Sequence, residues 1–281
     1  MTWEKSELDG ELVKEVAARY GVDLLSAAIF VRRGVTDSSD VLFYLEEDLQ
    51  YAHSPFLFDE MEDVVERLMQ AAEEGERVLV FGDRDVDGIT STAVMVETLT
   101  DLGLEPEWRV PMGDDSYGLS VQLVEEFAAR DGTLIVAVDC GTTNVAEITR
   151  GQQLGVDTIV IDHHNPQEEL PPATAIINPK VGDGGYPFQG LCACGVTSKV
   201  RSALAFARTD LFREQVCLLN LRPGNETVIV DAVKLENLIE VDRISEALVP
   251  DLGDLEHSRL ADFLLGQKLL VYDAPGQERL R

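Results

Sequence analysis

The order of apolar and polar residues between positions 77 and 180 predicts strands that alternate with helices. Three strongly apolar runs stand out, and two weaker ones accompany them: 77–83 (RVLVFGD), 133–139 (TLIVAVD) and 157–162 (DTIVID), with 105–111 (EPEWRVP) and 174–180 (TAIINPK). Helical spacing fills the gaps at 89–103, 120–132 and 145–155. Near-continuous apolar strands separated by helices are typical of a parallel sheet buried on both faces. The pattern therefore predicts an α/β fold with helices on both faces of the sheet.

The flanking segments follow other patterns. Residues 1–50 contain three short stretches with helical spacing and predict a helical N-terminal arm. A longer amphipathic helix is expected within 58–76, with Gly75 marking its end. After residue 210, the runs 216–223 and 225–235 predict an antiparallel pair, helices are expected over 241–250 and 258–268, and a strand over 268–274. We therefore expect an arm (1–50), an α/β domain (51–210) and an appended or inserted, partial α+β segment (211–281).

Composition narrows the class of protein. The chain of 281 residues has 52 acidic and 23 basic residues and a net charge of −29. Residues 1–60, 61–210 and 211–281 are each net negative, so no segment resembles the basic patch of a duplex-coating protein. There is no apolar run of about 20 residues, and the N-terminus lacks the pattern of a signal peptide. Four irregularly spaced cysteines do not suggest a disulfide framework. We expect a cytoplasmic protein with no membrane association.

Acidic and imidazole side chains follow three of the predicted strands. The first strand leads into Asp83, Asp85 and Asp87, the second ends at Asp139, and the third leads into Asp162-His163-His164. Since the carboxyl ends of parallel strands meet at one edge, these groups are expected to converge there. Carboxylates crowded in this way repel one another, and a divalent cation relieves the repulsion. Mixed oxygen and imidazole donors suit Mn²⁺ or Mg²⁺ better than a thiolate-rich zinc site.

Each cluster taken alone has a simpler interpretation. Asp83-Arg84-Asp85 is compatible with a turn that contains a local ion pair, and Asp139 with a helix N-cap. The histidine doublet is harder to explain in this way, because the chain has only four histidines and two of them are adjacent at a strand end. The joint occurrence of all three clusters favours a metal site.

Together these motifs resemble the DHH phosphoesterase superfamily, and in particular its branch of RecJ-type single-strand-specific exonucleases. The resemblance covers roughly residues 50–205. Its motifs are GDRDVDGITSTA (82–93), VAVDCGTTN (136–144) and DHH (162–164), supported by 54–68, VPMGDDSYGLS (110–120), INPK (177–180) and YPFQGLCACGVTSKV (186–200).

The resemblance implies roles for individual residues. Five would bind a pair of Mn²⁺ or Mg²⁺ ions, with Asp139 as the bridge: Asp83, Asp85, Asp87, Asp139 and His163. Asp162 would orient a histidine ring, and His164 would face the scissile phosphate as a catalytic hydrogen-bond donor. Three further residues are candidates for substrate binding: Tyr117, Lys199 and Arg201. Lys199 matches the family pattern, whereas Arg201 is only a nearby basic residue.

The activity implied by the resemblance is 5′–3′ hydrolysis of single-stranded DNA in repair and recombination. The partners would be single-stranded DNA or a short oligonucleotide and a single-strand-binding protein. Alternatives are an oligonucleotide or cyclic-dinucleotide phosphodiesterase of the same superfamily, or an inactive module that binds nucleic acid or a partner. A haloacid-dehalogenase phosphatase would account for Asp85 to Thr90, but it gives no role to Asp162-His163-His164.

The sequence departs from the family pattern at three places. Gly113-Asp114-Asp115-Ser116 stands where an arginine usually precedes YGL, and Cys192-Ala193-Cys194 stands where glycine and alanine are usual. We expect both cysteines to be small buried residues. A further aspartate of the family, in a context like DLVALGTxAD, is absent after the 186–200 motif, and residues 211–281 weakly resemble the opening of a DnaQ-like fold. We therefore interpret the chain as a truncated form with slow turnover, in which Asp231 is the first candidate to replace the absent aspartate.

Overall fold

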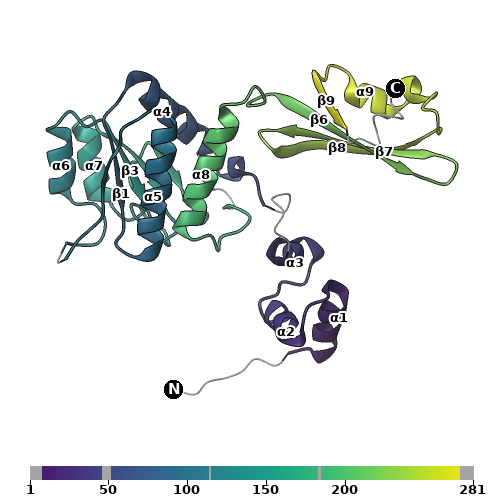
Figure 1. The fold of residues 1–281 in the computed structure, drawn as a ribbon, viewed down its shortest axis with the longest axis horizontal. Helices are drawn as coiled ribbons and strands as arrows, with labels where there is room; N and C mark the ends of the chain where they lie inside the picture. The colour runs from purple at the N-terminus through teal and green to yellow at the C-terminus, as the bar shows by residue number, and fades with distance from the viewer. Residues whose placement is uncertain (1–7, 46–51, 114, 183–184, 273–281) are drawn as a thin grey trace. The chain divides into compact units, whose positions relative to one another are not determined.

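The computed structural model describes residues 8–45, 52–113, 115–182 and 185–272 (Figure 1). The chain divides into two compact units, residues 1–53 and 54–281. The first unit contains the helices α1 (Gly10–Tyr20), α2 (Leu24–Arg32) and α3 (Ser38–Leu45). The carboxylates of Asp9 and Asp23 cap the first two helices, because each accepts hydrogen bonds from amides of the following turn. A small core of Val13, Val16 and Ala27 holds these helices together.

The second unit is built around a parallel sheet. Its strands are β1 (Val78–Gly82), β2 (Glu107–Arg109), β3 (Leu134–Val138), β4 (Asp157–Ile161) and β5 (Ala175–Ile177), in the order β2-β1-β3-β4-β5. All residues of β1 and β3 are buried, as expected for strands covered on both faces. The α/β fold predicted from the sequence is confirmed.

Helices cover both faces of this sheet (Figure 1). One face packs against η2 (Pro55–Leu57), α4 (Met61–Glu74), α5 (Val86–Asp101) and α8 (Ala193–Ala207). The other packs against α6 (Val121–Ala128) and α7 (Val145–Gln153). With both faces closed, the loops at the carboxyl ends of the strands are where the sheet can present polar side chains to a ligand. No helix of the described segments has the length and apolar character needed to cross a membrane.

A second, mixed sheet follows α8. It contains β6 (Gln215–Pro223), β7 (Val228–Glu236), β8 (Ile239–Leu248) and β9 (Leu269–Tyr272), which lie in the sheet in the order β8-β7-β6-β9. Along the chain, η3 (Leu255–His257) and α9 (Arg259–Leu264) connect β8 to β9. The predicted antiparallel pair is confirmed in β6 and β7, and β9 runs parallel to β6. Cys217, Val230 and Ala232 form the centre of its core.

The predicted helix over 241–250 is wrong, because residues 241–248 belong to β8. Consecutive residues Lys234 and Leu235 of β7 pair with Asp242 and Glu240, so Val241 is an extra residue in β8 that breaks the alternation of this strand. Toward its carboxyl end, Ile244 and Leu248 still face the core, but the residues before them are out of phase. The resulting spacing of Val241, Ile244 and Leu248 imitates a helical face.

Candidate metal centre

The first part of the site is the acidic turn between β1 and α5. Asp83 is buried, and Asp85 caps α5 by accepting a hydrogen bond from the Gly88 amide at 2.9 Å. This hydrogen bond is the main reason that the pKa of Asp85 is lowered. Gly88 lies so close to Asp83 that an added Cβ atom would stand 2.4 Å from the Asp83 carbonyl oxygen. The turn can therefore bring its carboxylates together only with glycine at this position.

We expect Gly88→Ala to lower the free energy of unfolding by about 1–3 kcal/mol, because the methyl group meets backbone atoms that cannot rotate away. Chemical denaturation measures this change, and a Mn²⁺ titration followed by thermal unfolding should show a weaker response. Gly195→Ala in α8 is the matched control, since its nearest contact would be a Leu191 side-chain carbon at 3.3 Å. Equal stability of the two variants would contradict the close fit of the acidic turn.

Asp139 is, with Asp162, one of the two most enclosed carboxylates of the site. It directly follows β3, is 1% exposed, and has a left-handed backbone with φ of 58°. Its amide donates to the Ile161 carbonyl at 3.0 Å, which fixes the side chain at the end of the sheet. Burial, and then repulsion from Asp87 and Asp85, raise the pKa of Asp139 to about 7.

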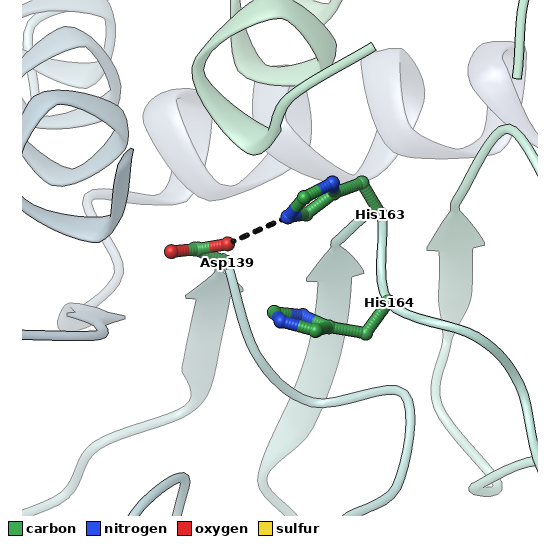
Figure 2. Close-up of side chains that lie close together, drawn as sticks. All are labelled: Asp139, His163 and His164. Carbon is green, nitrogen blue, oxygen red and sulfur yellow. Dashed lines mark ion pairs between the residues drawn. The ribbon is translucent and has the colours of Figure 1, made fainter. Parts of the chain in front are cut away.

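His163 faces this carboxylate from the neighbouring strand end. Its Nε2 lies 3.3 Å from Asp139 Oδ1 and 3.6 Å from Asp87 Oδ2. Figure 2 shows Asp139 and the rings of His163 and His164 gathered at the ends of β3 and β4. The sequence prediction that these strand ends converge is confirmed in the geometry.

Asp162 organises the loop that carries the two histidines. Its Oδ1 accepts from the amides of His163 and His164 at 2.7 and 3.2 Å and lies 2.7 Å from His164 Nδ1, while Oδ2 accepts from the Thr142 amide. Burial opposes ionisation of Asp162, but the hydrogen bonds from Thr142 and His164 lower its pKa overall. Asp162 is therefore held as a carboxylate that orients its neighbours.

Asp87 is positioned by a helix that lies far away in the sequence. Its two carboxylate oxygens accept from the backbone amides of Ala193 and Cys194, each at 2.8 Å, at the N-terminus of α8. Here one prediction fails, because Cys192 is exposed and Cys194 is partly exposed. The reason is that Cys192 is the N-cap of α8, where its sulfur accepts from the Gly195 amide, so the residue lies at the helix end and not within the core.

A loop between β2 and α6 approaches the same centre. Tyr117 donates from its hydroxyl to the Asp139 carbonyl at 3.2 Å, and this hydroxyl lies 3.3 Å from His164 Nδ1. Burial and the surrounding carboxylates raise the pKa of Tyr117. Arg84 donates to the carbonyls of Gly113 and Asp115 in this loop, each at 3.0 Å. Asp114, part of the departure from the family pattern, lies outside the described residues.

Two supporting features were not singled out from the sequence: the α8 amides that hold Asp87, and Asn178. Asn178 donates to the Thr142 hydroxyl at 3.1 Å and to the His164 carbonyl at 2.9 Å, so it ties the histidine loop to the loop after β3. Asn178 belongs to the INPK motif, and an asparagine directly after a predicted buried strand is a signal that could have identified it.

The remaining candidates are on α8 and in the second sheet. Lys199 is half-buried, and burial lowers its pKa. Arg201 pairs with Glu97 at 3.0 Å and with Asp101 at 3.4 Å, so its guanidinium fastens α8 to α5. Asp231 is held by Arg222 on β6, with oxygen–nitrogen distances of 2.6 and 3.1 Å. In the described part of the chain, neither Arg201 nor Asp231 belongs to the groups of possible metal ligands.

The donor atoms form two groups that share Asp139. Asp83, Asp85 and Asp139 make one, and Asp139, His163 and His164 the other; within each group the ligand atoms lie within 4.8 Å of one another. Asp83 Oδ1 and Asp139 Oδ1 are buried and accept no hydrogen bond from the described residues, and Asp139 Oδ1 has only the contact with His163 Nε2 at 3.3 Å. Buried carboxylate oxygens left in this state are costly unless a cation meets them. The residues therefore fit one or two divalent cations, with Asp139 positioned to serve both.

Comparison with known proteins identifies the family of the chain. Residues 77–219 match the family described as "DHH family, N-terminal domain", and the chain belongs to the DHH family. It is 35% identical over 206 residues to the single-stranded-DNA-specific exonuclease RecJ of Bacillus subtilis (strain 168), and 38% identical over 184 residues to that of Escherichia coli (strain K12). These alignments cover 73% and 64% of this chain but 26% and 31% of the two relatives.

A solved structure gives the same relationship. RecJ from Thermus thermophilus in complex with Mn²⁺ superposes with a TM-score of 0.53 and 28% identity, over 70% of this chain and 27% of that one. The chain thus spans about a quarter to a third of the length of the curated relatives described above.

Proposed function

We propose that this chain is the catalytic portion of a metal-dependent phosphodiesterase that hydrolyses single-stranded DNA from the 5′ end. The observation that carries the proposal is the shared carboxylate of Asp139, which joins an acidic group and an imidazole group at one edge of the sheet. The similarity to RecJ exonucleases supports the choice of substrate. A cytoplasmic location and contact with a single-strand-binding protein belong to the same proposal, as does a separate domain over 51–210.

The metal would be held by Asp83, Asp85, Asp139 and His163, with Asp87 beside them. A bound Mn²⁺ or Mg²⁺ supplies an activated water and neutralises charge on the phosphate, which also allows an acidic protein to accept an anionic substrate. Asp162 holds Nδ1 of His164, so Nε2 is the nitrogen that can meet a phosphate oxygen. The α8 amides fix Asp87, and Tyr117 braces the Asp139 backbone and lies beside His164.

The proposal is tested with 5′-labelled single-stranded DNA and Mn²⁺. We expect slow release of short products from the 5′ end, no release in the presence of a chelator, and little cleavage of a blunt duplex. His163→Ala should reduce the rate on the order of 100-fold, since it removes a metal ligand while the fold remains. Short oligonucleotides and cyclic dinucleotides serve as parallel substrates. Absence of metal-dependent hydrolysis of all of these substrates would leave only a binding module and would refute the proposal.

A further inference from the structure

A groove outside the metal centre lies between α5 and the edge strand β2. Its volume is about 530 Å³, and it is lined almost entirely by apolar atoms. Ile89, Ala93 and Val96 form one wall at helical spacing along α5, and Trp108 forms the other. A groove of this size and polarity is typical of a site for a flat, apolar ligand group.

The side chains of this groove are unusually exposed for their type. β2 is the last strand of its sheet, and Trp108 pairs in register with Val80, whose side chain faces the core beneath α4 and α5. Trp108 therefore extends that face beyond the last covered strand, and it is 63% exposed, while Ile89 is 50% exposed. A contiguous exposed apolar surface that includes an indole is typical of an interaction site.

The charge around the groove restricts what can bind in it. The chain carries a net charge of −29, yet among the described residues that line the groove only Glu97 is charged, and it is paired with Arg201 at 3.0 Å. The Thr92 hydroxyl donates to the Gly88 carbonyl at 2.8 Å, and the residue is buried. The surface thus offers neither an unpaired cation for a phosphate nor an accessible Thr92 hydroxyl for reading a base edge. It suits a neutral ring that binds by stacking.

The groove and the metal centre share one helix. Asp85 is the N-cap of α5, Asp87 is in its first turn, and Ile89 lies four residues beyond Asp85, about one helical turn along the axis. A strand whose phosphate reaches the acidic turn would therefore have a neighbouring base within reach of Ile89 and Trp108. We propose that this groove binds a nucleobase of the single-stranded substrate, stacked on the Trp108 indole, an inference that rests on the proposed function. Stacking of this kind is tolerant of sequence.

The fluorescence of Trp108 can be used to measure binding in the groove. The chain has two tryptophans, Trp3 and Trp108, so Trp3→Phe leaves Trp108 as the only one. This variant is titrated with a thymidine decamer in Ca²⁺, used in place of Mn²⁺ to limit hydrolysis, and with an abasic strand of the same length. We expect the decamer to quench Trp108 fluorescence and to bind roughly 10-fold or more tightly than the abasic strand, the effect of at least one stacked base.

A second variant separates stacking from apolar contact. Trp108→Leu in the otherwise unchanged chain should reduce the affinity for the decamer to that for the abasic strand. The Mn²⁺-induced shift of the thermal midpoint should stay unchanged, because Trp108 is not one of the proposed metal ligands.

The outcomes distinguish the two proposals. Equal binding of both strands without quenching, together with intact hydrolysis, overturns the nucleobase site and leaves the proposed function standing. The same holds if Trp108→Leu binds the decamer normally, which would point to a protein partner for this surface. Failure to bind either strand and to hydrolyse any oligonucleotide overturns the proposed function and the nucleobase site together.

Discussion

Replacing Asp139 with asparagine should stabilise the metal-free protein and abolish its stabilisation by Mn²⁺. In the unsubstituted protein, Mn²⁺ at 100 times its Kd should add about 2.7 kcal/mol to the free energy of unfolding, or roughly 5–10 °C in Tm. Asp139→Asn removes the carboxylate shared by both groups of ligands. We expect the Kd for Mn²⁺ to rise by at least about 100-fold. Loss of a residue that only supports a metal ligand weakens metal binding by up to about 100-fold, and loss of a shared ligand should weaken it at least as much.

The expected gain in stability of the metal-free Asp139→Asn variant follows from the burial of Asp139 and its repulsion by neighbouring carboxylates. The pKa of Asp139 is raised to about 7 from an ordinary value of 3.8, so the folded state holds this proton more tightly than the unfolded state. Stability is therefore lost as the pH rises from about 4 to 7, and the penalty is complete above pH 7. The advantage of the asparagine variant should be largest at about pH 8 and vanish near pH 4.

Thermal unfolding at several pH values, with and without Mn²⁺, measures both effects. Asparagine is suitable because it tolerates the left-handed backbone of this position. Asp131→Asn is the matched control, since Asp131 is exposed and has a similar φ of 60°. It should change neither the pH dependence nor the response to Mn²⁺. A normal Mn²⁺ shift in Asp139→Asn would exclude this carboxylate as the shared ligand.

Concentrated salt should stabilise the protein strongly. A net charge of −29 makes the folded state repel itself, and the Debye length falls from about 10 Å at 0.1 M salt to about 3 Å at 1 M. We expect Tm to rise by roughly 10 °C or more between 0.1 M and 2 M KCl. Because each kcal/mol of unfolding free energy corresponds to about 2–4 °C in domains of 150–250 residues, this rise corresponds to a stabilisation of about 2.5–5 kcal/mol.

A charge variant tests the cause of this effect. Glu105, Glu168 and Glu169 are exposed, and replacing all three with lysine changes the net charge by +2 each, from −29 to −23. The variant should have a higher Tm at 0.1 M KCl and a shallower dependence on salt, with little difference at 2 M. A Tm that is flat or falls with KCl would show that repulsion contributes little to the stability.

The sequence was informative where chemistry follows directly from residue type. Buried apolar strands ending in Asp83, Asp139 and Asp162 predicted both the sheet and the edge at which the donors meet. The sequence was uninformative where backbone groups or neighbouring elements determine the contacts of a side chain or the pattern of a strand. The amides that hold Asp87 have no residue signature, and the bulge at Val241 within β8 hides the alternation of that strand.

Arg201 illustrates the same limit for charged side chains. Its place on α8 suggested a phosphate contact, but which carboxylates it meets depends on how α8 packs against α5. Similarly, β2 was expected only as a weak strand, and nothing in its sequence indicated that it is the last strand of the sheet and leaves Trp108 exposed. Both features are set by topology, which local patterns do not encode.

The hydrogen bonds between Asp87 and the start of α8 also impose an order of events during synthesis. Asp87 and Ala193 are 106 positions apart, so a ribosome must add all of β2, β3, β4 and β5 before the amides that hold this carboxylate exist. A nascent chain ending before α8 would carry the acidic turn without its partner helix. Contacts of such long sequence separation form slowly because a large loop must close first. The metal centre is consequently assembled late, after the sheet that supports it has been translated.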